Sequence, residues 1–471
     1  MRLKTVTLKN FRCFESLTLD LHPQLTVIVG NNGAGKTALL DGIATALTPV
    51  LTHLSSANQR LRQSGRGFKD ADFRIESYSG RGGKTLWAKA DFAQVMVETY
   101  DELRWDYWKP SGITKGVEPP EKWGETQLKD RLSAIYASYK TTHPLLFPIF
   151  AYYGVGDIKV PERLRDAKLN YEHPTAALYD CLDPGSDFRE MLEWFDLEES
   201  SELRENKGQV DEEFTPFDSL SAVRAAVVGL LGQYSNPHFN SKHKFMLTRQ
   251  TDGAPMLVEQ ISQGYKRMLS IAMDFARRLA IANPQLAHSD DYATELVQQA
   301  LDQLRPLGVM PDAPFGEALS MSAPAIMLVD EIDLHLHPSW QQRVLQDLMR
   351  TFPLTQFIVT THSPQVLSTI RRENIRVLSG SSAEMPLAST YGQPSGDVMH
   401  SVMLVDPQPP IEEKQTIDRL TELVDQGLWG EAEARRLLQQ LTQTLGPENA
   451  RLQQLLRSIQ RQEALAGLSK Q

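Results

Sequence analysis

Residues 27–40 read VIVGNNGAGKTALL, and this stretch decides how the rest of the chain is interpreted. The apolar run that begins at Leu25 and leads into it is typical of a buried strand. The strand pattern ends in a glycine-rich loop, after which apolar residues recur at helical spacing. The loop matches the pattern Gly-x-x-x-x-Gly-Lys-Ser/Thr at Gly30, Gly35, Lys36 and Thr37.

A loop of this kind binds phosphate, because consecutive backbone N–H groups curl around the phosphate oxygens. Lys36 is predicted to reach the β and γ phosphates of a nucleotide, and the Thr37 hydroxyl to ligate Mg²⁺. The predicted phosphate-contacting residues are Asn31, Asn32, Gly33, Ala34, Gly35, Lys36, Thr37 and Ala38.

A second buried-strand pattern, from Ala325 to Val329, ends in Asp330 and Glu331. A carboxylate at the tip of a strand beside the P-loop strand can hold the magnesium and its water shell, and we assign this role to Asp330. Glu331 is the candidate base that orients and deprotonates an attacking water. Without the P-loop, the same pattern would also be typical of an apolar strand that ends in surface acids.

A third apolar strand pattern, in TQFIVTTHSPQVL (355–367), leads to His362. Ligands of open α/β sheets bind at the carboxyl ends of the strands, where His362 is predicted to donate a hydrogen bond to the γ phosphate. His335 and His337 form a His-x-His pair of a kind that can bind zinc. No further ligand cluster accompanies the pair, so a role in shaping the turn after Glu331, or in a subunit contact, is favoured.

The stretch ISQGYKRMLSIAMDFARRLA (261–280) begins with Ser-x-Gly and continues as an amphipathic helical pattern. A serine N-cap at Ser262 offers spare donors and a positive helix end to an anion. The alternative is a plain N-cap for a core helix. Lys266 and Arg267, just inside the helix, either add positive charge beside a phosphate or are solvated.

In the order P-loop, ISQGYKRML, LVDE and TTHS, these motifs resemble those of ABC-type ATPases of the RecF/SMC/OLD branch. LKNFRCFESLTLDL (8–21) is similar to the first strand and turn of that branch. The resemblance implies an α/β fold, an ABC-type P-loop ATPase head with a mixed sheet, which binds and hydrolyses ATP with Mg²⁺. It also implies a homo-oligomer, a dimer or higher, with composite sites. In these sites the γ phosphate on one subunit's P-loop is capped by another subunit's signature motif, at Ser262, Gln263 and Gly264.

The motifs divide the chain into predicted parts. Residues 1–50 and 255–380 form the ATPase head, 51–254 an inserted lobe, 381–410 a linker and 411–471 a C-terminal helical region for partner docking or oligomerisation. Sustained heptads are absent from the sequence between the P-loop and the signature, so a long coiled coil is not expected.

Three segments have open interpretations. AYYGVGD (151–157) lies near the position of the family's glutamine loop but has no glutamine, and Tyr153 and Gly154 are equally typical of core. The Arg- and Lys-rich segment 58–84 is either a phosphate-contacting surface or a solvated loop. The amphipathic pattern ATELVQQALDQL (293–304) is a candidate oligomer contact.

The C-terminal region contains three helical patterns, 411–428, 431–445 and 448–462. Their apolar stripes are expected to pack on the ATPase body or on a partner protein. The net charge of −10 argues against a uniformly basic surface. Two cysteines are too few for a disulfide framework, and the sequence lacks an apolar run long enough for a membrane span, so we expect a cytoplasmic protein.

The short tail lacks the Asp-x-Asp metal cluster found in the nuclease domain of OLD-type relatives, so no intrinsic nuclease is expected. In overall layout the chain resembles the PtuA ATPases of Septu anti-phage defence systems, whose companion is an HNH nuclease. The predicted function is therefore an ATP-gated sensor that controls a separate HNH-type nuclease in anti-phage defence, with DNA as a candidate ligand. The alternative is a RecF-like DNA-repair clamp without a nuclease partner; the motor of a transporter fits the N-terminal motif poorly.

Overall fold

The computed structural model of the chain describes residues 1–54, 61, 64–79, 84–112, 117–156, 173–185, 188–208, 214–287, 290–311 and 318–468. Contacts within it separate the chain into two units, Met1–Met403 and Leu404–Gln471. The first unit holds all of the predicted motifs.

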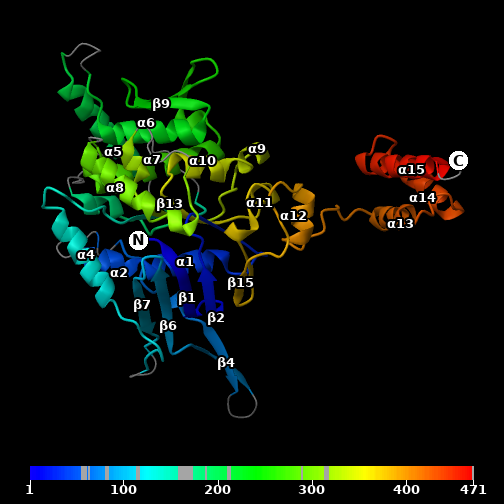
Figure 1. The fold of residues 1–471 in the computed structure, drawn as a ribbon, viewed down its shortest axis with the longest axis horizontal. Coiled ribbons are helices and arrows are strands. Elements are labelled where there is room, and N and C mark those ends of the chain that lie inside the picture. Colours follow the sequence, from blue (N-terminus) through cyan, green and yellow to red (C-terminus); the bar gives the residue numbers. More distant parts are fainter. Residues whose placement is uncertain are drawn as a thin grey trace. The chain divides into compact units, whose positions relative to one another are not determined.

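A six-stranded sheet forms the centre of the first unit (Figure 1). Neighbouring strands are parallel except at one edge, where β15 runs antiparallel to β14. Every residue of β3, β13, β12 and β8 is buried, as expected for parallel strands covered on both faces. The mixed sheet confirms the predicted fold class. Its order is β15 (Ser382–Glu384), β14 (Ile375–Ser379), β3 (Leu25–Val29), β13 (Thr355–Thr360), β12 (Ala325–Val329) and β8 (Ile149–Tyr153).

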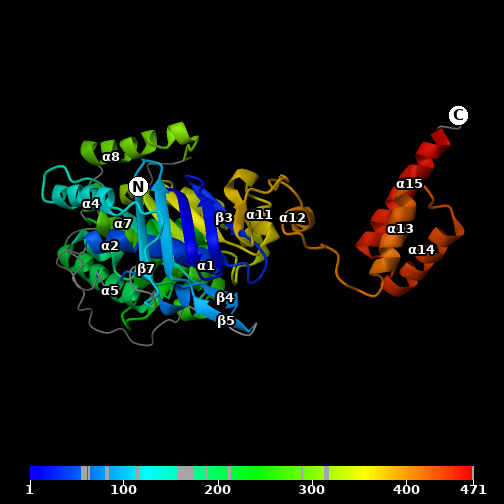
Figure 2. The ribbon, with the colours of Figure 1, turned by 90° about the horizontal axis from the view of Figure 1, so that it is seen from below.

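A four-stranded antiparallel sheet lies on one side of this centre and faces the viewer in Figure 2. Between the two sheets lie helices α1 (Lys36–Ala46) and α2 (Thr48–Leu54). A Cβ on Gly42 of α1 would lie 2.6 Å from Leu8 Cδ2, so the glycine allows the helix to approach β1 closely. The strand order is β2 (Phe14–Asp20), β1 (Leu3–Phe11), β6 (Phe92–Thr99) and β7 (Arg104–Pro110).

The segment Lys36–Leu54, which spans α1 and α2, is apolar and long enough to cross a membrane by length and composition. Within the protein, however, 83% of it is buried between the sheets. Its apolar character is therefore explained by its place in the core.

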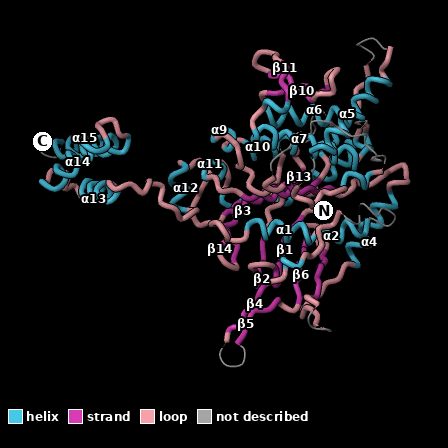
Figure 3. The backbone as a smooth tube through the Cα atoms, turned by 180° about the vertical axis from the view of Figure 1, so that it is seen from behind, coloured by secondary structure: helices cyan, strands magenta, loops and turns pink. Residues whose placement is uncertain are grey.

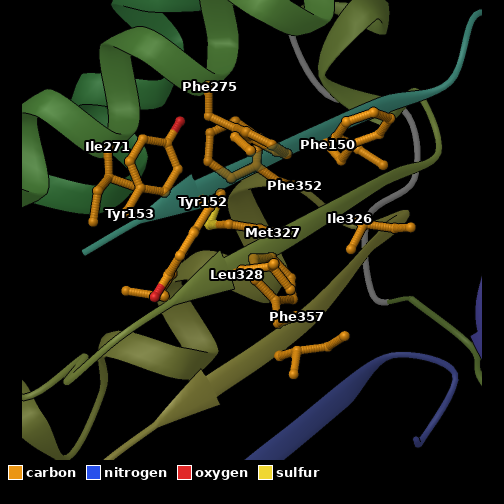
Figure 4. Close-up of a cluster of buried hydrophobic side chains, with 14 of the residues drawn as sticks. Phe150, Tyr152, Tyr153, Ile271, Phe275, Ile326, Met327, Leu328, Phe352 and Phe357 are labelled. Carbon is orange, nitrogen blue, oxygen red and sulfur yellow. The ribbon is translucent and has the colours of Figure 1, made fainter. Parts of the chain in front are cut away.

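Helices cover the other face of the central sheet (Figure 1). Figure 4 shows how they meet it: Phe275 of α7 and Phe352 after α10 pack edge to face with ring centroids 5.0 Å apart, above the side chains of β8 and β12. Edge-to-face packing suits the quadrupoles of aromatic rings. The helices of this layer are α5 (Phe188–Glu205), α6 (Asp218–Leu231), α7 (Gln263–Ala282) and α10 (Val344–Thr351). Shorter or peripheral helices are α4 (Thr126–Ser138), α8 (Asp291–Asp302), α9 (Pro338–Gln341) and α11 (Pro364–Leu367).

The interval 51–254, which we expected to be an inserted lobe, contributes to both main sheets. Strands β6 and β7 pair with the N-terminal strand β1, and β8 forms an edge of the central sheet. Periodicity predicts a strand but not its partner, because sheet pairing joins residues far apart in sequence. A small sheet and a hairpin complete this interval: β9 (Tyr234–Phe239), β10 (Phe245–Arg249) and β11 (Pro255–Leu257), and β4 (Ile75–Ser79) with β5 (Thr85–Lys89).

The predicted linker 381–410 is partly folded. Its first residues form β15, and it also contains helix α12 (Ser395–Ser401), whose Val398 is fully buried in the core of the first unit. Composition rich in Ser, Gly and Pro indicated a linker. Here, however, the short strand β15 pairs with the edge of the central sheet, and the short helix α12 buries Val398 in the core of the first unit.

The second unit is a bundle of three helices, at the positions that the helical patterns predicted. Their apolar stripes pack against one another, so the expectation that they require the ATPase body or a partner is wrong for the buried positions. Three short amphipathic helices can close a core among themselves when each turns its stripe inward. The helices are α13 (Lys414–Asp425), α14 (Ala432–Leu445) and α15 (Ala450–Leu468), with a core of Ile417, Leu420, Leu423, Val424, Ala434, Leu441, Leu452 and Leu455.

Candidate nucleotide-binding site

The predicted motifs from three distant segments meet at one edge of the central sheet. Strands β3 and β12 both pair in parallel with β13, which lies between them. All three therefore end on the same side, which brings the P-loop, Asp330 and His362 to the carboxyl edge of the sheet. This edge is the candidate site.

The P-loop has the backbone that its glycines predict. Gly33 and Gly35 have φ angles of 79° and 98°, which residues with a Cβ rarely adopt. A Cβ on Gly35 would also lie 2.7 Å from both Cys13 Sγ and Phe14 Cζ, so the turn before β2 and the start of β2 leave no room for a side chain. Asn31, Asn32 and Gly33 are exposed. The loop therefore presents its backbone to solvent directly before the N-terminus of α1, where an anion is favoured.

Lys36 folds back over this loop. Its Nζ donates to the carbonyl of Gly30 at 2.9 Å and to that of Asn31 at 3.2 Å. Burial lowers the pKa of Lys36, and the nearby carboxylates of Asp330 and Glu331 oppose this shift only in part. The ammonium group is thus held over the glycine loop. A phosphate bound there would compensate for the hydration that the ammonium group loses on burial.

Asp330 is held by two hydroxyl groups. Thr37 Oγ1 donates to its Oδ2 at 2.7 Å, and Thr360 Oγ1 donates to its Oδ1 at 2.6 Å. A hydroxyl and a carboxylate are hard oxygen ligands of the kind that Mg²⁺ prefers. The donor set fits the ion, and Thr37 and Asp330 are the residues that would hold it.

Glu331 has an uncommon backbone conformation. Its φ of 48° lies in the left-handed region, which is sparsely populated for residues other than glycine. Its N–H donates to Thr360 Oγ1 at 2.7 Å, so the same hydroxyl group contacts both acidic residues. Strained conformations of this kind persist where the surroundings hold them and are concentrated at functional sites.

Arg267 binds the carbonyl oxygen of the peptide bond between Asp330 and Glu331, whose N–H donates to Thr360. Its Nη2 donates to the carbonyl oxygen of Asp330 and, at 3.3 Å, to that of Gly154. The residue is only 4% exposed, and burial lowers the pKa of Arg267 while the Asp330 and Glu331 carboxylates oppose that shift. Its Nη1 has no hydrogen-bond partner among the described residues. The alternative of a solvated charge for Arg267 is therefore wrong, and a charge beside a bound phosphate stays a prediction.

Ser262 is the N-cap of α7, as predicted, with φ −66° and ψ 160°. Its side chain caps no N–H of the helix in the part of the chain that the structure describes, and both Ser262 and Gln263 are exposed. Gly264 is buried against the turn after Glu331, and a Cβ there would overlap the carbonyl oxygen of His335. Among described residues, no hydrogen bond joins residues 262–264 to the P-loop of the same chain.

Comparison with known proteins adds the family. Residues 5–219 match a family model described as an AAA domain. Residues 224–368 match a second AAA domain model, whose description also names the AbiEii toxin of a type IV toxin–antitoxin system. "Retron Ec83 probable ATPase" of Escherichia coli is 27% identical, covering 98% of this chain and 87% of that protein. "Retron Vc95 probable ATPase" of Vibrio cholerae serotype O1 biovar El Tor is 25% identical, covering 84% of this chain and 77% of that protein.

A shorter match links the chain to Septu. "Septu protein PtuA" of Bacillus mycoides (strain KBAB4) is 42% identical over 59 residues, which are 12% of this chain and 8% of that protein. The chain belongs to the ATPases of the RecF/SMC/OLD branch. Nucleotide binding by this ATPase follows from its family and from the P-loop.

Sequence reasoning missed two residues of the site, Thr360 and Asp333, and did not predict the contact that Arg267 makes. Thr360, Asp333 and Arg267 support the predicted residues through hydrogen bonds. Thr361 Oγ1 donates to Asp333 Oδ1 at 2.5 Å, and the His362 N–H donates to the same oxygen at 3.3 Å. The TTHS and LVDEID motifs contain Thr360 and Asp333, so a search for polar residues facing each other across neighbouring strands would have found both; Arg267 carried no such signal.

Two other predictions have structural outcomes in this ATPase. Tyr153 is core: it is 5% exposed and its hydroxyl donates to Asp274 Oδ2 at 2.8 Å. Burial would raise the pKa of Asp274, but Arg278 and Arg277 outweigh it and lower the pKa to about 2. His337 shapes the turn after Glu331, because it caps α9 by accepting the Ser339 N–H at 3.3 Å.

Two arginines of the basic segment 58–84 form ion pairs within the chain. Arg66 is nearly buried and pairs with Asp72 at 2.9 Å and Asp41 at 3.1 Å. Arg74 pairs with Glu15 and Glu76 at 3.1 and 3.3 Å. The remaining arginines of the segment, Arg60, Arg62 and Arg81, lie outside the described residues.

Proposed function

We propose that two copies of this ATPase enclose ATP, with the P-loop of one copy facing Ser262, Gln263 and Gly264 of the other. One observation carries the proposal: Ser262 is exposed at the N-terminus of a 20-residue helix, and its side chain caps no N–H of that helix among the described residues. The hydroxyl and the positive helix end are therefore available to an anion from outside the chain. ATP then joins the two copies, and hydrolysis separates or rearranges them.

Each side chain has a distinct part in the proposed reaction. Thr37 and Asp330 hold Mg²⁺, which when bound neutralises charge on the phosphates. Lys36 contacts the β and γ phosphates, and Glu331 takes a proton from the attacking water. His362 donates a hydrogen bond to the γ phosphate.

We further propose that this cytoplasmic ATPase regulates a separate HNH-type nuclease in anti-phage defence. Support comes from the similarity to two retron ATPases over most of the chain and to a Septu protein over a short stretch. Mass measurement of the complex isolated from the native host tests this step. An HNH-type subunit is expected; a complex that contains DNA and no nuclease favours the alternative RecF-like repair clamp.

The composite site is tested by mixing two inactive variants. Ser262→Arg disables the signature end and Lys36→Ala disables the P-loop. In a mixed dimer, the intact P-loop of the first variant faces the intact signature of the second. Random pairing of equal amounts should restore about a quarter of wild-type ATP turnover, since half of the dimers carry one intact site of two.

A second mixture provides the matched control. Glu331 and Lys36 belong to the same edge of the same chain, so Glu331→Gln mixed with Lys36→Ala leaves no intact site and should restore nothing. Restoration in both mixtures, or in neither, would count against the shared site. Co-expression of the two variants ensures that mixed dimers form.

A further inference from the structure

Strand β13 is an inner strand of the central sheet, next to β3 (Figure 3). All of its residues are buried, yet threonines stand at both of its ends, Thr355 and Thr360. A buried hydroxyl group costs free energy unless it finds a hydrogen-bond partner. Thr355 Oγ1 has no partner among the described residues, whereas Thr360 Oγ1 has two. The two hydroxyl groups at the ends of the strand are therefore used differently.

The hydroxyl group of Thr360 contacts both acidic residues of the site. Its Oγ1 donates its proton to Asp330 Oδ1 at 2.6 Å and accepts the Glu331 N–H at 2.7 Å. A hydroxyl group has one proton to donate, so Thr360 cannot donate to a second acceptor at the same time. The β-branch of threonine restricts rotation about χ1, which keeps Oγ1 directed at these two partners. The last residue of β13 thus joins the two acids that follow β12.

Asp330 has a hydroxyl group on each of its carboxylate oxygens. Thr360 donates to Oδ1, and Thr37 donates to Oδ2 at 2.7 Å. Donors on both oxygens fix the rotation of the carboxylate, so the direction of its remaining lone pairs is set before a cation binds. Thr37 is itself a proposed ligand of Mg²⁺, whereas Thr360 can act on the ion only through Asp330. Removal of a group that holds a metal ligand in this way typically lowers metal affinity or activity by about 10- to 100-fold.

The peptide bond before Glu331 is held at both of its polar atoms. Its N–H donates to Thr360, and its carbonyl oxygen accepts from Arg267. The φ of 48° that Glu331 adopts is uncommon for a residue with a Cβ. Without the Thr360 hydroxyl group, the N–H loses this partner and φ can relax towards the ordinary region. Such a change in φ moves the Glu331 side chain, because its Cβ is attached to the same Cα.

We propose that Thr360 is a positioning residue, which orients Asp330 for Mg²⁺ and Glu331 for the attacking water. This inference rests on the roles proposed above for the two acids. Because one hydroxyl group serves two residues, its removal should change two quantities that can be measured separately. Through Asp330 it should weaken ATP binding in the presence of Mg²⁺, and through Glu331 it should lower ATP turnover.

The first test is equilibrium ATP binding in the Glu331→Gln background, which keeps hydrolysis slow during the titration. Thr360→Val keeps the branched shape but can neither donate nor accept a hydrogen bond. Its ATP affinity should fall about 10-fold or more with Mg²⁺ and stay unchanged in EDTA, where it also shows that the variant is folded. The matched control is Thr355→Val, which removes the unpartnered hydroxyl group at the other end of the strand and should change neither affinity.

The second test is single-turnover hydrolysis at saturating ATP and Mg²⁺. Thr360→Val should lower the rate about 10- to 100-fold when Glu331 is present. In the Glu331→Gln background the further loss should be less than about twofold, because no base remains to be displaced. General damage to the fold would lower both rates by the same factor. Thr360→Ser keeps the hydroxyl group and should retain most of the turnover.

Wild-type turnover in Thr360→Val overturns the proposal, and so does an equal loss of turnover with and without Glu331. An equal loss of ATP affinity with Mg²⁺ and in EDTA overturns the part that concerns Asp330. These results leave the proposed function intact if Glu331→Gln by itself lowers turnover. If Glu331→Gln hydrolyses ATP normally, the proposed base is wrong and the role of Thr360 towards it is wrong as well, so the two failures are distinguishable.

Discussion

The carboxyl edge of the central sheet and the N-terminus of α7 are the two halves of the predicted ATP site, and they differ in how far one chain completes them. At the sheet edge, Asp330 accepts hydrogen bonds from Thr37 of α1 and Thr360 of β13, and Lys36 donates to carbonyls of its own P-loop. At the helix end, Ser262 and Gln263 are exposed. The difference teaches that one chain holds the predicted phosphate and magnesium ligands in hydrogen bonds but leaves the predicted phosphate-capping residues Ser262 and Gln263 exposed.

The largest expected effect tests whether the sheet edge contains the chemistry. Glu331→Gln should lower ATP turnover by about 10²- to 10⁴-fold, the usual contribution of a general base. ATP affinity should change little, because the uncharged side chain keeps its shape. Single-turnover hydrolysis and equilibrium nucleotide binding measure the two quantities. The control is Glu384→Gln, at an exposed residue of β15. Normal turnover in Glu331→Gln would locate the base elsewhere.

A second change tests whether the P-loop at the same edge binds ATP. Lys36→Ala removes charge-assisted hydrogen bonds of about 1.5–3 kcal/mol, so ATP affinity should fall by about 10- to 150-fold. Isothermal titration with ATP and Mg²⁺ measures it, and Lys129→Ala on exposed α4 is the control. Unchanged affinity would remove the P-loop assignment and with it the division into two halves.

The smallest expected effect tests the link between the halves. Arg267 joins the helix that begins at Ser262 to the carbonyl beside Glu331. Arg267→Met should lower turnover about 10-fold through a displaced Glu331 while leaving ATP affinity within about twofold. Lys266→Met, one residue earlier with its Nζ on the Glu259 carbonyl, is the matched control.

Arg267 acts as a positioning residue only if Arg267→Met lowers ATP turnover while ATP affinity stays nearly unchanged. The melting temperature distinguishes this from general damage, since a merely destabilised protein loses turnover only near its transition. If turnover and affinity fall together in Arg267→Met, or if Arg267→Lys restores full turnover without the two hydrogen bonds, the link is not made through Glu331.

Much of the site followed from local sequence. The glycines of the P-loop, the strand that ends in Asp330 and Glu331, and the Ser262 N-cap are visible because spacing and periodicity within about ten residues determine each of them. Arg267 was not predictable in this way. An arginine one turn into a helix is ordinarily solvated, and its burial depends on β8 and β12 lying beneath that particular face.

By itself, the sequence determined the ATPase motifs, the central strands and the three C-terminal helices, because the physics of loops, strands and helices acts between near neighbours in the chain. Only the tertiary structure decided that residues 51–254 supply strands to both main sheets, that the C-terminal helices bury their stripes in one another, and that Arg267 lies under the Asp330 peptide. These outcomes depend on which surfaces meet across long separations, and no local pattern contains that choice.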